Sequence, residues 1–108
     1  MFITTPVIFS QSAFYGFNRT HYERLLRSKS CPGCFLYYAK LSNIDLSGAN
    51  LRGTALIGAS FRGATLKNAN LKGAKVRGAN FTGADLTGAI WVDGQVCAQG
   101  SVGYCKTQ

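Results

Sequence analysis

A stretch of twenty residues near the middle of the chain decides its fold. Residues 69–88 read ANLKGAKVRGANFTGADLTG, which is four groups of five that each begin with alanine and end with glycine. The third residue of each group is large and apolar, and the same period extends in both directions, so that every fifth residue from Leu36 to Trp91 is large and apolar. Such a run in register indicates an internal repeat.

A five-residue period fits neither an α-helix nor a flat β-strand. On a helix, each step of five residues turns the large side chain by about 140°, so the apolar residues would be spread around the whole circumference. On a strand, an odd period sends successive large residues to opposite faces of the sheet. The pattern therefore predicts a coil that turns a corner every five residues. One large and one small side chain point inward on each side, and glycine or asparagine makes the corner.

The repeat resembles that of a known family. Residues 49–53 (ANLRG) and 84–88 (ADLTG) are similar to the A-(D/N)-L-x-x unit of the pentapeptide-repeat proteins. The resemblance implies an all-β fold, a right-handed quadrilateral β-helix with four repeats per coil, and hence about three coils for this chain. We expect the first coil to be the least regular, because departures from the family pattern gather near its start. The departing residues are Phe35, Tyr37, Tyr38, Ile44 and Thr54.

The segments that flank the repeat predict a cap at each end. Residues 20–23 (THYE) read as a capping box, and apolar residues follow at helical spacing, so we expect a short capping helix within residues 19–30. The β-helix then covers residues 31–92. Residues 93–108 lose the period, contain two cysteines and predict a looped tail. Residues 1–18 carry no charge and lack the basic region of a signal peptide. We expect a flexible extension there, with a segment packed over the rod as the first alternative and a degenerate signal region or a membrane-surface anchor as the others.

The four cysteines stand in two local pairs, Cys31 with Cys34 and Cys97 with Cys105. In the implied fold the two pairs lie roughly 15 Å apart, too far to share a zinc ion, whose bonds to sulfur are near 2.3 Å. Redox catalysis through the C-x-x-C motif would need a βαβ setting that the pattern lacks. Two local disulfides and reduced thiols both remain as interpretations, and local pairing of an even count favours an oxidising compartment.

The chain of 108 residues is basic, with 12 Lys and Arg against 4 Asp and Glu and a net charge of +8. Apolar residues make up 46% of it, too many for a disordered basic tail, and no run of apolar residues is long enough for a membrane span. Between residues 52 and 77 there are six basic residues and no acidic one. We call them the basic belt, because four repeats per coil distribute them around the rod. The belt consists of Arg52, Arg62, Lys67, Lys72, Lys75 and Arg77.

No group of residues has the spacing of a catalytic or metal-binding site, and the single histidine, His21, lies in the predicted capping helix. We therefore predict a non-enzymatic structural or protein-interaction module with no cofactor, metal or small-molecule substrate. The alternative is a binder of nucleic acid or an anionic membrane surface through the basic belt. An imperfect cap could also let two rods stack end to end as a homodimer. The cysteine pairing favours a periplasmic, lumenal or secreted location.

Overall fold

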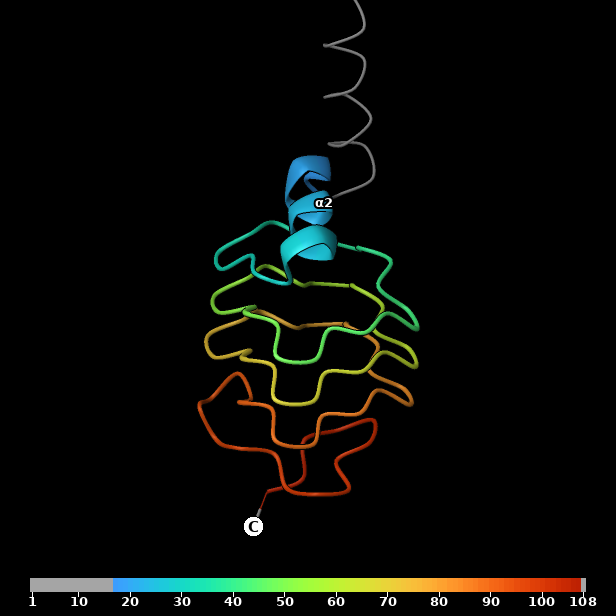
Figure 1. The fold of residues 1–108 in the computed structure, drawn as a ribbon, viewed down its shortest axis with the longest axis vertical. Coiled ribbons are helices and arrows are strands. Elements are labelled where there is room, and N and C mark those ends of the chain that lie inside the picture. The colour runs from blue at the N-terminus through green and yellow to red at the C-terminus, as the bar shows by residue number, and fades with distance from the viewer. Residues whose placement is uncertain (1–16, 108) are drawn as a thin grey trace, which may run out of the picture.

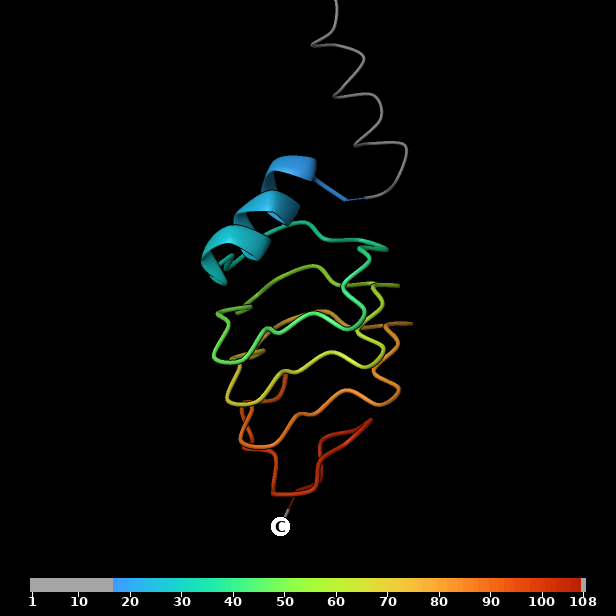
Figure 2. The same ribbon diagram turned by 45° about the vertical axis from the view of Figure 1, so that its right-hand side comes forward.

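The structure is a computed structural model that describes residues 17–107, and the predictions for residues 1–16 lie outside the described residues. The described chain forms a rod. Helix α2 (Arg19–Ser28) lies across one end, successive coils stack beneath it, and the C-terminal residues lie at the other end (Figures 1 and 2). No helix within residues 17–107 has the length and apolar character needed to cross a membrane.

Each coil has four sides, which we call faces I to IV. In the middle of the rod, face I comprises residues 50–54, face II 55–59, face III 60–64 and face IV 65–69. A residue shares its face with the residues twenty positions before and after it, because parallel β-bridges join pairs such as Asn50 and Asn70. This register agrees with the expected four repeats per coil, and it places side chains from distant parts of the sequence in columns along the rod.

The corners between faces are tight turns. At the corner after Leu56, the N–H of Ala59 donates to the Leu56 carbonyl oxygen at 3.0 Å, and Gly58 between them has φ +71°. A hydrogen bond of this span with a positive φ at the third residue is typical of a type II turn, which explains the glycine at the end of each repeat.

Three corners within the repeat carry a side chain instead of glycine: Tyr38, Asn43 and Asn68 have φ values of +57°, +61° and +60°. Asparagine tolerates this conformation well, whereas tyrosine does so rarely. Each of these side chains lies against the glycine twenty residues later, which is Gly58, Gly63 or Gly88. A Cβ atom on that glycine would collide with the side chain. The three side chains therefore fit because the corner residue in the next coil is a glycine, which has no side chain.

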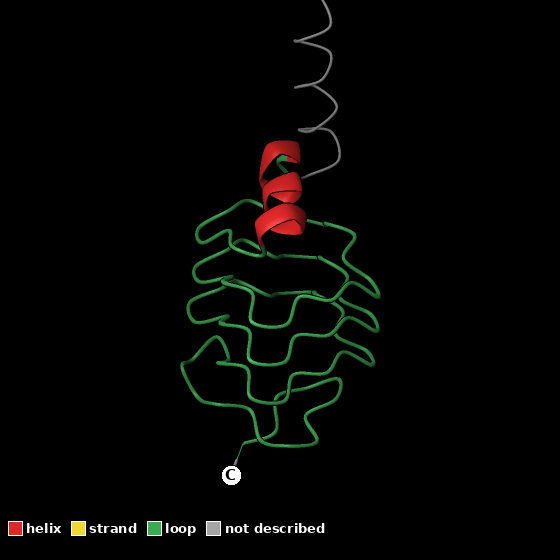
Figure 3. Ribbon diagram, viewed as in Figure 1, coloured by secondary structure: helices red, strands yellow, loops and turns green. Residues whose placement is uncertain are grey.

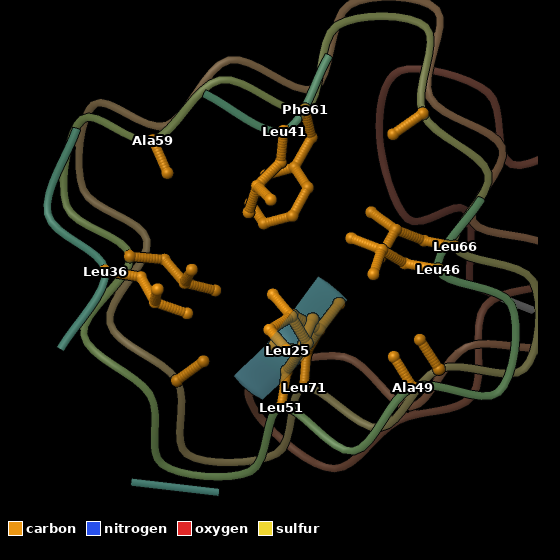
Figure 4. Close-up of a cluster of buried hydrophobic side chains, with 14 of the residues drawn as sticks. Leu25, Leu36, Leu41, Leu46, Ala49, Leu51, Ala59, Phe61, Leu66 and Leu71 are labelled. Carbon is orange, nitrogen blue, oxygen red and sulfur yellow. The ribbon is translucent and has the colours of Figure 1, made fainter. Parts of the chain in front are cut away.

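The core consists of stacked side chains that point to the rod axis from all four faces. In Figure 4, Leu41 lies over Phe61, Leu46 over Leu66, and Leu51 over Leu71. The small alanines beside them are equally buried, which fits so narrow an interior. Thr54 stands at a position where most repeats have alanine. Its hydroxyl is buried but not unpaired, since it donates to the Leu51 carbonyl oxygen at 2.8 Å.

The described coils contain isolated β-bridges and no extended strands (Figure 3). Each straight side is only a residue or two long before the next corner, too short for a continuous ladder. Backbone hydrogen bonds between coils nevertheless follow the parallel β pattern: Leu56 N–H donates to Lys75 O at 2.8 Å, and Lys75 N–H donates to Thr54 O at 2.9 Å.

Helix α2 covers the first coil as predicted, but it begins earlier than the capping box suggests. The N-cap is Asn18, whose side chain accepts a hydrogen bond from His21 N–H at 3.0 Å, so the proposed cap at Thr20 is wrong. The start is set by docking: Asn18 N–H donates to the Phe35 carbonyl oxygen at 3.0 Å, and Phe17 forms a bridge with Leu36. Both residues belong to the lid, although the sequence placed them in the flexible extension.

The C-terminal tail reverses direction after the last repeat. Antiparallel bridges pair Ile90 with Val96 and Asp85 with Val102, so the tail runs back over faces I and IV. Ser101 is fully buried there, and its hydroxyl donates to Ala98 O and accepts from Lys106 N–H. The described part of the tail therefore lies along faces I and IV, and its Gly103 N–H also donates to Ala84 O, at the end of face III, at 2.9 Å.

Candidate functional site

The cysteines form two local disulfides, Cys31–Cys34 and Cys97–Cys105, which confirms the first of the two interpretations of the sequence. Cys31-Pro32-Gly33-Cys34 is a repeat corner, with proline and glycine at the two central positions that a type II turn favours and φ +72° at Gly33. Cys31 and Cys34 point into the core and are buried. The pairs lie at opposite ends of the repeat, where they close the first coil and the tail.

All four acidic residues of the chain are engaged locally. Glu23 contacts Arg19 at 3.4 Å, Asp45 lies 3.9 Å from Lys29, and Asp85 lies 3.9 Å from Lys67. The fourth, Asp93, accepts hydrogen bonds from the backbone and side-chain amides of Gln95. Face IV, which carries Asp45 and Asp85, is therefore close to neutral, while the other three faces keep their positive charge.

The structure distributes the basic belt over four faces, as the register requires. Face I carries Arg52 and Lys72, and face II carries Lys75 and Arg77. Arg62 lies on face III, and Lys67 lies on face IV beside Asp85. Within residues 17–107, Lys67 is the one belt residue with an acidic partner within 4.0 Å. The belt residues without an acidic partner thus lie on faces I, II and III.

Face II differs from the others in its exposed aromatic side chains. Phe35 is 54% exposed and Tyr38 is 61% exposed, and both lie on this face two coils from Lys75. His21, Phe35 and Tyr37 form a row of nearly parallel rings, with centroids 5.9 Å and 6.4 Å apart. Sequence reasoning noted these residues only as irregularities. The twenty-residue register could have placed them beside Lys75 and Arg77, but His21 joins them only through the position of α2.

His21 is a structural member of this row. Its Nδ1 accepts a hydrogen bond from Phe35 N–H at 3.0 Å, and partial burial, with the nearby Arg24 guanidinium, lowers the pKa of its imidazole. Both effects favour the neutral ring. His21 therefore joins α2 to the first coil at physiological pH without adding charge to face II.

An Asn or Asp residue directly before a central residue of the repeat has a role that sequence reasoning missed. Its side-chain oxygen accepts a hydrogen bond from the backbone N–H two residues later, as from Lys72 N–H to Asn70 at 3.0 Å and from Thr87 N–H to Asp85 at 3.0 Å. This is the local bond by which Asn and Asp stabilise turns. The (D/N) position of the repeat is thus explained by corner formation and needs no ligand.

These bonds predict a stability change in acid. The backbone N–H of Thr87 is the main cause that lowers the pKa of Asp85 below its ordinary value of 3.8, and Lys67 contributes less. The ionised carboxylate therefore stabilises the folded state above pH 3.8, and this contribution is lost as the pH falls through the lowered pKa. We expect Asp85→Asn, which keeps the acceptor oxygen, to flatten the fall in the urea midpoint between about pH 4 and pH 2.

The effect should be small, about 0.5 kcal/mol or less, because the group is near the surface. Asn80→Asp serves as the control, because Asn80 accepts the same bond from Thr82 N–H but does not titrate. It should steepen the same pH profile. Identical profiles for the original protein and Asp85→Asn would contradict the assignment.

Within residues 17–107, no three His, Cys, Asp or Glu side chains gather closely enough to hold a metal ion. Asp45 and Asp85 share face IV, and Thr65 lies between them in the column of bridges. Among the described residues, face II combines exposed rings with cations that have no acidic partner within 4.0 Å.

The four-sided rod, its twenty-residue register and its glycine corners define a solenoid repeat protein. A family model described as pentapeptide repeats matches residues 33–68 and 65–91 with eight copies, which together span more than half of the chain. The protein belongs to the pentapeptide-repeat family, and it is a structural repeat module of that kind.

Solved structures of the same family are similar to this chain. HetL, a pentapeptide repeat protein involved in heterocyst differentiation regulation from the cyanobacterium Nostoc sp. strain PCC 7120, is 37% identical with a TM-score of 0.60, over 62% of this chain and 32% of HetL. The match thus spans about a third of HetL. A pentapeptide repeat protein from the Arabidopsis thaliana thylakoid lumen is 31% identical over 56% of this chain and 63% of its own, with a TM-score of 0.29. No curated protein matches the chain.

Proposed function

We propose that the protein is a non-enzymatic interaction module, a short rod of about three right-handed coils that binds a protein partner on face II. The carrying observation is the composition of that face: exposed Phe35 and Tyr38 lie on the same face as Lys75 and Arg77, and the face has no acidic residue. Aromatic side chains and arginine are the groups that contribute most at protein interfaces. The partner therefore presents an apolar anchor for the rings and acidic residues for the cations.

The rod is a suitable platform for such a surface. The bridges and the inter-coil hydrogen bonds fix the spacing of side chains along a column, so little conformational entropy is lost when the face is covered. The two disulfides favour an oxidising compartment, which supports a periplasmic, lumenal or secreted location.

The test compares two substitutions that change charge in the same way. Arg77 and Arg62 occupy the same position of the repeat on faces II and III, and both are exposed. The full-length protein is used to capture partners from an extract of its own organism after nuclease treatment. We expect Arg77→Glu to weaken binding of the captured protein by about tenfold or more, and Arg62→Glu to change it less than about twofold. Equal effects of the two variants would refute face II as the binding surface.

A nucleic acid or anionic membrane is the second candidate, and the row of rings beside cations favours it specifically, because bases stack on aromatic side chains. Binding of a labelled single-stranded oligonucleotide, and of vesicles that contain anionic lipid, should then fall steeply with salt. Retention of either ligand with no salt dependence would exclude this mode. Loss of the captured partner after nuclease treatment would favour it over a protein partner.

A further inference from the structure

Face II lacks the polar residue that closes turns on the other faces. On faces I, III and IV, an Asn or Asp directly before a central residue accepts a hydrogen bond from the backbone N–H two residues later, as Asn50 does from Arg52 N–H at 3.2 Å. The equivalent positions of face II hold Phe35, Ala55 and Lys75, whose side chains have no acceptor. In the described repeat, face II is therefore the one face on which no bond of this kind forms.

A column of backbone donors results on this face. The N–H groups of Tyr37, Ile57 and Arg77 have no acceptor within residues 17–107. The equivalent N–H groups of the other faces meet side chains on the outside of the rod, so these three are directed to the outer surface of face II as well. A backbone N–H without a partner in the protein bonds to water or to a ligand.

The carbonyl groups of the same face are already engaged. In residues 55–57 and 75–77 every carbonyl oxygen accepts a backbone hydrogen bond, as Ile57 O accepts from Tyr38 N–H at 2.9 Å. These two coils of face II therefore present donors without free acceptors. An added β-strand needs both kinds of group, so it could not pair here. The group that fits such a surface is an acceptor, and an anionic one is favoured by the charge.

Two cations lie beside these donors. Lys75 is bridged to Ala55 and is thus one coil, about 4.8 Å, from the level of Ile57, and Arg77 carries its cation on the same coil as Lys75. Neither has an acidic partner within 4.0 Å among the described residues. On the other side of Ile57, one coil away, lies the exposed ring of Phe35. Donors, cations and an apolar contact therefore adjoin one another on one face.

We propose that face II binds carboxylate groups of its protein partner, with the backbone N–H groups of Ile57 and Arg77 as donors and the side chains of Lys75 and Arg77 as counter-charges. Hydrogen bonds to an ionised acceptor are stronger than those between neutral groups. The inference rests on the proposed function and names the chemistry of that site. A segment that carries glutamate or aspartate next to an apolar residue meets the donors and the rings together, whereas inorganic phosphate meets the donors alone.

Ala55→Asn tests the role of the donors without a change of charge. The new side chain should accept from Ile57 N–H, as Asn50 accepts from Arg52 N–H, and so occupy the donor that the ligand needs. We expect binding of an acidic peptide to weaken by about fivefold or more. The urea midpoint should stay the same or rise, because asparagine stabilises turns of this kind. The variant therefore loses binding while it keeps its fold.

Two further variants serve as controls. Thr65→Asn places the same side chain in the same coil on face IV, and it should change binding less than about twofold. Ala55→Leu adds a side chain of similar size that accepts no hydrogen bond, so it should also change binding less than about twofold. If Ala55→Leu weakened binding as much as Ala55→Asn, crowding of the face would be the cause and the donor role of Ile57 would be wrong.

The probe is a 12-residue peptide with four glutamates and two phenylalanines, titrated into the oxidised full-length protein labelled with nitrogen-15. We expect binding in the millimolar range or tighter, with larger shifts of the Ile57 and Arg77 amide signals than of their neighbours Leu56 and Gly58. The exchange of the Ile57 and Arg77 amides with solvent should slow when the peptide is bound. A peptide with glutamine in place of each glutamate should bind at least about tenfold more weakly.

Several results would overturn the proposal. They are no binding of the glutamate peptide at about 10 mM, equal binding of the glutamine peptide, shifts that avoid Ile57 and Arg77, and unchanged binding by Ala55→Asn. Inorganic phosphate that reproduces the same shifts at the same concentration would show a general anion site and would also refute it. If Arg77→Glu still weakens the captured partner more than Arg62→Glu does, face II remains the binding surface and the carboxylate chemistry alone is wrong.

Discussion

Replacing Phe61 by alanine is expected to lower the free energy of unfolding by about 3–5 kcal/mol, the largest effect we predict for one substitution. Phe61 is the bulkiest fully buried side chain of the core. It lies in the face III column beneath Leu41, and its ring is stacked on Phe81 with centroids 5.0 Å apart and planes 3° from parallel. Alanine would leave a cavity that the hydrogen-bonded coils above and below cannot close, because their spacing is fixed by the backbone.

The measurement is guanidinium-induced unfolding with the disulfides intact, followed by circular dichroism and by the fluorescence of the single tryptophan, Trp91. Coincident transitions would show that one cooperative unit unfolds. Phe35→Ala is the matched control: it removes the same side chain from an exposed position, and should cost less than about 1 kcal/mol.

A second variant separates cavity formation from loss of the aromatic ring. Phe61→Leu introduces the residue that the same column carries at Leu41, so it should recover most of the stability lost in Phe61→Ala. If Phe61→Leu were as unstable as Phe61→Ala, ring stacking on Phe81 would outweigh packing volume in this column. If Phe35→Ala were as destabilising as Phe61→Ala, the assignment of the core would be wrong.

The inner part of this rod could be read from the sequence because one short rule fixes both the backbone and the packing. A corner every five residues requires a positive φ at one place and an inward side chain at two others. Leu56, Gly58 and Ala59 satisfy all three requirements, as their counterparts do elsewhere. The register of twenty then follows from four corners per coil, which explains why the positions of Arg52 above Lys72 and of Asp45 on the face of Asp85 were predictable.

The structure of the two ends could not be predicted in the same way, because the five-residue period is absent from the segments that form them. Asn18 and Thr20 are both sound N-cap residues, and the choice between them depends on the hydrogen bond from Asn18 N–H to Phe35 O, a tertiary contact. The tail was predicted as a loop, but its reversal over faces I and IV is decided by which core positions Cys97 and Ser101 fill. The row of rings on face II depends on the N-terminal end, because His21 joins it through the position of α2.

Helix α2 carries the second large prediction, that Leu25→Ala will destabilise the protein by about 2–4 kcal/mol. Leu25 is the one fully buried residue of the helix, and Figure 4 shows it over the Leu51 and Leu71 column. A solenoid cannot bury the apolar side chains of its first coil without a cap. Shortening Leu25 therefore removes its own contacts and also exposes the core beneath it to water.

Leu26→Ala is the control that isolates burial from helix formation. Leu26 is the next residue of α2 and is 41% exposed, so its replacement makes the same change in helix propensity with little loss of packing. We expect a cost of less than about 1 kcal/mol for Leu26→Ala. Unfolding by guanidinium measures both costs, and binding of a hydrophobic dye to the folded variants should rise only for Leu25→Ala. Equal costs and equal dye binding would mean that α2 is an appendage of the rod, whereas the predicted difference makes it the lid that the first coil requires.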